Sequence, residues 1–313
     1  MGGPNRRFSR RWACYPRKVL QRTYSHRLGA YALEFYTFVA DNYAPFYTVP
    51  IECTERDAAY VLDGLLYHQA DIDPEEHYTD THGYTELNFA AFAMFGKRFC
   101  PRIRGLQHQW IYRPDQPRDY GPLTPVLSPS HRTLHMDWIV EHWDRIAQFF
   151  ASFAAGHTTA SVALKRLVAC GPRNHFFRAV RELGRVFKTE FILDYLSQPS
   201  LRRRIRHGLL KGEELHALAR SVHYGRRGRA DQRDFRQQTS SASCLVLILA
   251  AIVYWQIREI ERILTTADPE AAEIDLGLLP HVSPIAWENV LLYGEYVLNR
   301  ALVRPCHGRP PAE

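Results

Sequence analysis

The spacing of hydrophobic residues changes once along this chain, and this change limits the possible fold more than any other feature. Between residues 33 and 104, short runs rich in β-formers alternate with helical spacing. These runs predict strands at 33–40, 46–53, 76–81 and 99–103, and helices at 55–67 and 85–96. After a Pro-rich loop at 114–130, the spacing stays helical to about residue 264. The sequence therefore predicts an α/β first half and a mostly α-helical second half.

Individual residues sharpen these boundaries. Thr85 is a typical N-cap and Gly96 a typical helix stop. Pro101 cannot donate to a ladder, so its strand is predicted at an edge. The longest apolar run, Cys244–Trp255, is shorter than the roughly twenty residues that span a bilayer. It predicts a buried helix beneath the segment around Glu213, with no membrane partner.

Composition excludes several classes of protein. Hydrophobic residues make up 46% and aromatic residues 12% of the 313, which suffices for a real core and excludes a disordered or collagen-like chain. Six scattered cysteines lack any C-x-x-C spacing. The beginning of the sequence has no apolar signal region. These features predict free thiols in a reducing cytoplasm.

The charge is unevenly distributed. Residues 1–33 hold eight Lys/Arg and no acid, and residues 201–236 hold eleven Lys/Arg against four Asp/Glu. Neutralisation of phosphates and a solvated helix face both explain the second segment. Apart from Tyr224 and Phe235, aromatic residues are not interleaved with these arginines, so contact with a nucleic-acid backbone is favoured over base stacking. The candidate DNA-binding residues are Arg202, Arg203, Arg204, Arg206, Lys211, Arg226, Arg227 and Arg229.

Two carboxylates are candidates for chemistry. Asp80 follows a predicted strand within H-Y-T-D-T-H-G, where a metal ligand or a helix-capping residue is typical. Glu213, in Lys211–Glu214, is predicted near the beginning of a helix, where the helix dipole alone favours an acid. A zinc or iron site made of Asp80 with His68, His77 and His82 is a weaker alternative, because its spacing matches no standard site.

Several short passages, which follow one another in the same order as in a known protein family, make the chain resemble that family. They are Phe38–Phe46, Tyr60–Leu66, Glu76–Thr85, Arg98–Arg104, His142–Asp144, Thr158–Ser161, Arg181–Arg185, Gly208–Glu213 and His281–Pro284. Through them the sequence resembles the C-terminal catalytic part of the Tn-three family of replicative transposases, from about residue 18 to 300.

The resemblance implies a ribonuclease-H-like fold with a DDE active site and a large helical insertion at about 134–205. By position Asp80 matches the second acid and Glu213 the third, and these would hold two Mg²⁺ or Mn²⁺ ions for DNA cleavage and strand transfer. Transposon ends and target DNA would be the partners, in the bacterial cytoplasm at the nucleoid. A homodimer is compatible with the family.

The chain departs from the family pattern at the first acid. The family places it on the first strand, whereas no Asp or Glu precedes Glu34. We therefore expect an irregular basic segment at 1–30, a DDE domain at 31–304 and a tail at 305–313. A missing first strand would leave a neighbouring strand edge exposed and weaken folding. The sequence predicts a transposase fragment lacking its first catalytic acid, or alternatively a non-catalytic DNA-binding remnant.

Overall fold

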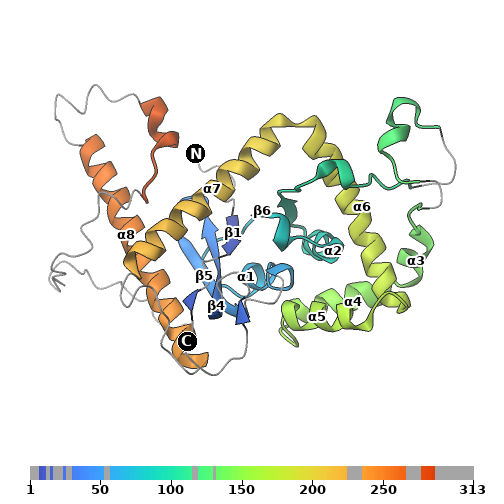
Figure 1. Ribbon diagram of the computed structural model, residues 1–313, viewed down its shortest axis with the longest axis horizontal. Coiled ribbons are helices and arrows are strands. Elements are labelled where there is room, and N and C mark those ends of the chain that lie inside the picture. Colours follow the sequence, from blue (N-terminus) through green and yellow to red (C-terminus); the bar gives the residue numbers. More distant parts are fainter. Residues whose placement is uncertain are drawn as a thin grey trace, which may run out of the picture.

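A computed structural model describes residues 7–11, 15–16, 24–25, 30–52, 57–114, 119–129, 132–223, 235–265 and 276–285. A mixed sheet lies at its centre (Figure 1). Its strands are β1 (Arg7–Arg11), β2 (Tyr15–Pro16), β3 (Tyr24–Ser25), β4 (Ala30–Ala40), β5 (Pro45–Glu52), β6 (Glu76–Thr79) and β7 (Arg98–Pro101). The main path is β2-β4-β1-β6-β7, and β3 and β5 also pair with β4.

The sheet confirms the four predicted strands. Strands β1, β6 and β7 run parallel, and β4 is antiparallel to both β1 and β5. Strand β7, which contains Pro101, lies at one end of the path, as the missing N–H of proline requires. The α/β first half is therefore present.

Strand β1 corrects the expectation of an irregular N-terminal segment with an exposed neighbouring edge. Phe8 pairs with Val39 of β4 on one side and with Tyr78 of β6 on the other. The central place in the sheet is thus filled by Arg7–Arg11, and β6 has no open edge there. This five-residue segment has only one large apolar side chain, so its sequence shows no alternation of apolar and polar residues. It forms a strand because it pairs with β4 and β6.

The two faces of the sheet are covered by different helices. On β4, Tyr36 and Phe38 pack on one face with α1 (Asp63–Leu66) and α2 (Glu86–Met94). Phe35 and Val39 pack on the other face with α7 (Pro199–Val222) and α8 (Phe235–Thr265). The alternation of β4 side chains thus divides the core into two layers.

The helices between residues 134 and 198 form a separate group on one side of the sheet (Figure 1). They are α3 (Met136–Glu141), α4 (Trp143–Ala154), α5 (Ala160–Cys170) and α6 (His175–Ser197). Short 3₁₀ turns complete the described chain at Asp57–Ala59, Thr81–Gly83, Leu106–His108, Gly121–Val126 and Leu276–His281. The mostly α-helical second half is confirmed.

The predicted helix boundaries hold in one place and fail in another. Thr85 caps α2, and its hydroxyl accepts a hydrogen bond from the Asn88 amide (3.3 Å). Gly96 follows with φ +63°, a conformation that favours glycine. The helix predicted at 55–67 is wrong in extent, because residues 57–59 form a 3₁₀ turn and only Asp63–Leu66 are α-helical.

Helix α8 differs from the buried helix that its apolar run predicts. Leu245, Leu249 and Val253 are buried against α7 and β4. Leu247 is 70% exposed and Tyr254 66% exposed, so the opposite side of the helix faces outward. The helical segment Thr239–Thr265 is long and apolar enough to cross a membrane by length and composition, which the twelve-residue run had not indicated. A single helix of this kind is weak evidence for a membrane.

Candidate active site

Asp80 lies directly after β6, at the carboxyl end of the parallel strands. Its Oδ1 accepts a hydrogen bond from the Gly83 amide (3.3 Å), which closes the turn before α2. Thr81, the next residue, donates its hydroxyl hydrogen bond to the Arg102 carbonyl (3.0 Å). Asp80 is half-buried. The predicted position at a strand end is correct, and the capping interaction is also present.

Alternation along β6 assigns Asp80 to one face of the sheet. His77 packs between the rings of Phe38 and Phe92, on the α2 face. Glu76 faces the other way, where its carboxylate accepts a hydrogen bond from Arg204 of α7 (3.3 Å). Side chains of a strand alternate between the two faces of the sheet, and Asp80 is four positions after Glu76. If the alternation continues past the end of β6, Asp80 points to the same face as Glu76, which is the α7 face.

This alternation corrects the zinc or iron hypothesis. The His77 side chain is 1% exposed and belongs to the aromatic core on the opposite face from Asp80. His68 packs edge-on against Phe46, and the side chain of His82 lies outside the described residues. Within the described part of the chain, no group of three His, Cys, Asp or Glu could hold a metal ion.

Helix α7 crosses the sheet over β6 and β1. Near its beginning Arg204 pairs with Glu76, the first residue of β6. Seven residues later, the Lys211 ammonium donates to the carbonyl oxygen of Asp41, which follows β4 (2.6 Å). Because β4 is antiparallel to β1, Asp41 lies at the end of the sheet where β1 and β6 begin. One flank of α7 therefore faces that end.

Glu213 lies on the opposite flank of α7. Two residues along an α-helix are about 200° apart around its axis, so Glu213 points away from the side that carries Lys211. Its side chain is exposed, whereas the neighbouring Gly212 and His216 are buried toward the sheet. The flank of Glu213 therefore faces the carboxyl ends of β1 and β6, which is the end that carries Asp80.

The helix around Glu213 begins earlier than predicted. Lys211–Glu214 lie inside α7, which starts at Pro199, a residue favoured in the first helical turn. The helix dipole at an N-terminus therefore does not explain Glu213. Its neighbour Glu214 has a different partner, since it accepts a hydrogen bond from the Ser283 hydroxyl (2.8 Å).

No described residue supplies a first acid on β1. The strand is R-F-S-R-R, and continuing its pairing with β6 by two residues brings Arg10 beside Asp80. Asp41 lies at the other end of the sheet and cannot replace the missing acid. Asp80 and Glu213 thus remain the candidate ligands, and carboxylates of this kind suit Mg²⁺ when substrate phosphates complete the coordination.

The structure divides the predicted DNA-binding arginines into two kinds. Arg203 and Arg206 are exposed. Arg202 donates to the carbonyl oxygens of Tyr195 and Leu196, so it serves the junction between α6 and α7. Arg204 and Lys211 also bind groups of the protein itself, as described above. Arg226, Arg227 and Arg229 lie outside the described residues.

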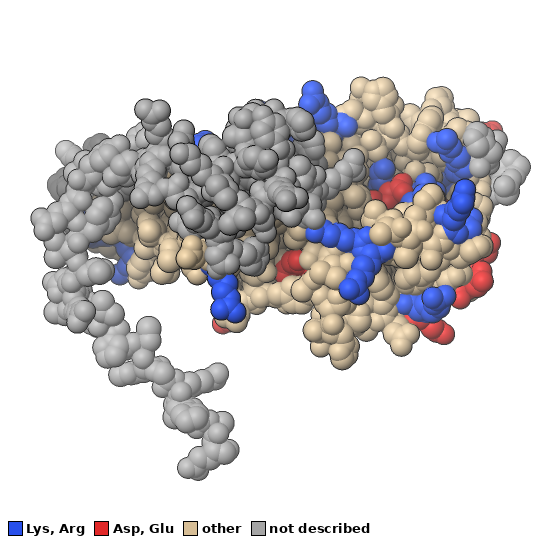
Figure 2. Space-filling model, turned by 60° about the horizontal axis from the view of Figure 1, so that its bottom comes forward, with Lys and Arg blue, Asp and Glu red and all other residues tan. Residues whose placement is uncertain are grey.

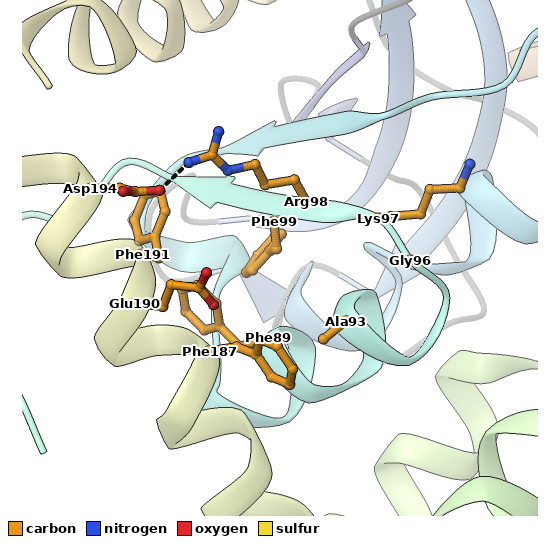
Figure 3. Close-up of a pocket in the computed structure, with 10 residues that line it drawn as sticks. All are labelled: Phe89, Ala93, Gly96, Lys97, Arg98, Phe99, Phe187, Glu190, Phe191 and Asp194. Carbon is orange, nitrogen blue, oxygen red and sulfur yellow. Dashed lines mark hydrogen bonds and ion pairs between the residues drawn. The ribbon is translucent and has the colours of Figure 1, made fainter. Parts of the chain in front are cut away.

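On the described part of the face in Figure 2, Lys and Arg lie in separate groups with Asp and Glu among them. A cavity of about 350 Å³ lies between β7, α2 and α6 (Figure 3). Phe89, Phe99 and Phe191 line it, and Arg98 pairs with Asp194 at its rim. Arg98 begins β7, so the ion pair lies at the end of the sheet away from Asp80.

A polar network between α2 and α6 was not predicted from the sequence. Glu86, the first residue of α2, accepts hydrogen bonds from the Tyr112 hydroxyl (3.1 Å) and from Arg185 Nε (3.2 Å). Arg185 also donates to Glu182 (2.6 Å), whose side chain is 1% exposed. Burial opposes the charge on Arg185, but the two carboxylates outweigh it and raise its pKa. Burial raises the pKa of Tyr112 to about 12, and the Glu86 charge adds to this.

Comparison with known proteins gives consistent results. Residues 9–296 match the Tn3 transposase DDE domain family. The chain is 43% identical over 263 residues to the transposase for transposon Tn21 of Escherichia coli and to that for transposon Tn501 of Pseudomonas aeruginosa. It is 38% identical over 267 residues to the transposase for transposon Tn1546 of Enterococcus faecium. Each match covers 84% of this chain and 26% of the relative, so the chain spans about a quarter of their length.

Proposed function

Because this chain belongs to the Tn3 transposase DDE domain family, we propose that it is a catalytic segment of a DNA transposase. Its reaction would be metal-dependent cleavage and joining of DNA strands at transposon ends and target DNA, in the bacterial cytoplasm. The proposal is supported by strand alternation and helix geometry, which direct Asp80 and Glu213, 133 positions apart, to the same end of one sheet. We extend the proposal to a DDE domain at residues 31–304, together with β1, which fills the centre of its sheet.

The two carboxylates have separate supports. Asp80 is held by the turn that its own hydrogen bond to Gly83 closes. Glu213 is held by α7, which Arg204 and Lys211 fix to the opposite end of the sheet. Rigid support of this kind keeps ligands in a productive geometry. When bound between these carboxylates and DNA phosphates, Mg²⁺ or Mn²⁺ would activate the attacking oxygen and stabilise the leaving one.

Metal binding by matched variants tests this assignment. We expect calorimetric titration with Mn²⁺ to show binding that Asp80→Asn and Glu213→Gln each weaken. Glu214→Gln and Asp41→Asn are the controls, because Glu214 binds Ser283 and Asp41 lies at the other end of the sheet. Equal Mn²⁺ affinity in all four variants and the wild type would refute the site. Nicking of plasmid DNA in Mn²⁺ should follow the same order.

The sequence of β1 favours a second candidate function. Since R-F-S-R-R carries no carboxylate, the chain would bind DNA without cleaving it. In that case DNA affinity falls steeply with salt, yet neither Mn²⁺ nor Asp80→Asn changes it. Mn²⁺-dependent nicking that Asp80→Asn abolishes would exclude this candidate.

A further inference from the structure

A second polar cavity lies between α6 and the segment that precedes α3. Its volume is about 380 Å³, and three arginines contribute to its lining, namely Arg132, Arg181 and Arg185. Glu182 is the one carboxylate among the lining residues. Arg185 pairs with Glu182 and also with a second carboxylate, that of Glu86. Cations therefore exceed carboxylates by one around the cavity.

Both carboxylates are already engaged by the protein. Glu182 accepts hydrogen bonds from Arg185 (2.6 Å) and from the backbone amide of His135 (3.4 Å). Glu86 accepts from Arg185 and Tyr112. Arg185 is thus already engaged by two carboxylates, the buried Glu182 and the half-buried Glu86.

Arg181 and Arg132 are left with unused donors. The Arg181 Nε is buried without a hydrogen-bond partner, and its closest carboxylate oxygen, on Glu86, is 3.9 Å away. Its guanidinium lies 5.6 Å from the ring centre of Phe177. Arg132 is exposed, and among the described residues its guanidinium makes no hydrogen bond or ion pair. A buried unmade hydrogen bond is costly, so a ligand with acceptor oxygens would be stabilised at Arg181.

The aromatic lining favours a phosphate over a nucleobase. His135 stacks on Trp138 with ring centres 4.0 Å apart and an angle of 11° between the planes. The Arg178 guanidinium lies 4.7 Å from the centre of the same ring. These two groups already contact the Trp138 ring, whereas the arginine donors of the cavity match phosphate oxygens.

The position of the cavity connects it to the candidate active site. Tyr112 and Arg185 both bind Glu86, which begins α2 six positions after Asp80. We propose that Arg132 and Arg181 bind a backbone phosphate of the DNA. This phosphate would lie near the phosphodiester that is held at Asp80. This inference rests on the proposed function and adds to it a phosphate subsite that is separate from the two carboxylates and from the arginines of α7.

The subsite is tested with a random-sequence duplex of about 30 base pairs, by fluorescence anisotropy at several salt concentrations. Arg132→Gln and Arg181→Gln should each weaken binding on the order of tenfold. Each should also lower the slope of log affinity against log salt by about one. Arg166→Gln, at an exposed arginine of α5 outside the cavity, is the matched control and should change neither quantity.

The outcomes separate this inference from the proposed function. If the wild type binds DNA with a salt slope and both cavity variants match it, the subsite is wrong and the transposase proposal stands. An equal loss in Arg166→Gln also overturns it, since net charge alone would then explain the effect. A wild type with no salt-dependent DNA binding refutes both. If Arg181→Gln unfolds, the exposed Arg132→Gln decides.

Discussion

Gly184 of α6 lies against the carbonyl group of Glu86, the first residue of α2. A Cβ at Gly184 would lie 1.8 Å from that oxygen and 2.6 Å from its carbon. Glycine is therefore required for this close approach of two backbones. The contact brings Arg185, on the same helix, within hydrogen-bonding distance of Glu86 and joins α6 to the segment that follows Asp80.

Gly184→Ala should destabilise the protein by about 3 kcal/mol, at the upper end of the range for overpacking, because the atom in contact belongs to backbone and cannot rotate away. Gly156→Ala is the comparison. Gly156 has φ +71° but open space around its Cβ, so it should lose only about 1 kcal/mol through backbone strain. Urea unfolding measures both. Equal losses would show that α6 can move away from α2.

Asp63 should make the stability of the protein depend on pH, and the Asp63→Asn variant should lack this dependence. Burial raises the pKa of Asp63, although its Oδ1 accepts a hydrogen bond from the Ser161 amide (2.9 Å). The folded state thus holds the proton more tightly than the unfolded state, whose pKa is about 3.9. Stability is fully present below that value and is lost as pH rises through the raised folded pKa.

Asp63→Asn keeps the acceptor oxygen and cannot ionise. Relative to this variant, the wild type should lose unfolding free energy as pH rises from about 3.5 to 7, measured by urea titration. Asp71→Asn, at an exposed carboxylate, controls for the removal of an acid. A constant difference between wild type and Asp63→Asn at every pH would contradict this prediction.

The two sides of α8 should respond differently to truncation. Leu249 is 0% exposed, so Leu249→Ala should cost about 3 kcal/mol through lost burial and the cavity left behind. Leu247 is 70% exposed, and Leu247→Ala should change stability by less than about 0.5 kcal/mol. Equal losses would mean that the outward side of α8 is also covered in solution.

The arginines of α7 should separate into two functional groups. Arg203→Gln and Arg206→Gln should each weaken DNA binding and lower its salt slope by about one, since both side chains are exposed. Arg204→Gln should instead lower the thermal midpoint, because it removes one of the cations that pair with Glu76. DNA binding that depends on Arg204 alone would reverse this division.

Much of the fold follows from local signals in the sequence. Alternation at 33–40, the Thr85 cap and Pro101 at an edge strand each act within a few residues. Strand β1 could not be predicted in this way, because its neighbours β4 and β6 supply what R-F-S-R-R lacks. The exposed side of α8 was missed for a related reason, since apolar composition alone does not define which side is covered.

The candidate site was predictable to a similar degree. Asp80 at a strand end came from local pattern, and Glu213 came from the family resemblance. The flank on which Glu213 lies depends on where Arg204 and Lys211 attach α7, and this is a tertiary property. The ion pair between Glu86 and Arg185 joins residues 99 positions apart, so no window of sequence could indicate it.

The pairing of β1 with β6 has a consequence for how the chain acquires its structure. Arg7 pairs in parallel with His77, seventy positions later, whereas β4 and β5 are joined by a short turn. Closing the longer loop costs more entropy, so the β4–β5 hairpin should form first and the centre of the sheet last. During synthesis, Arg7–Arg11 can pair with β4 early, but the other edge of β1 stays open until β6 has left the ribosome. In the nascent protein this edge of β1 is therefore exposed to wrong partners.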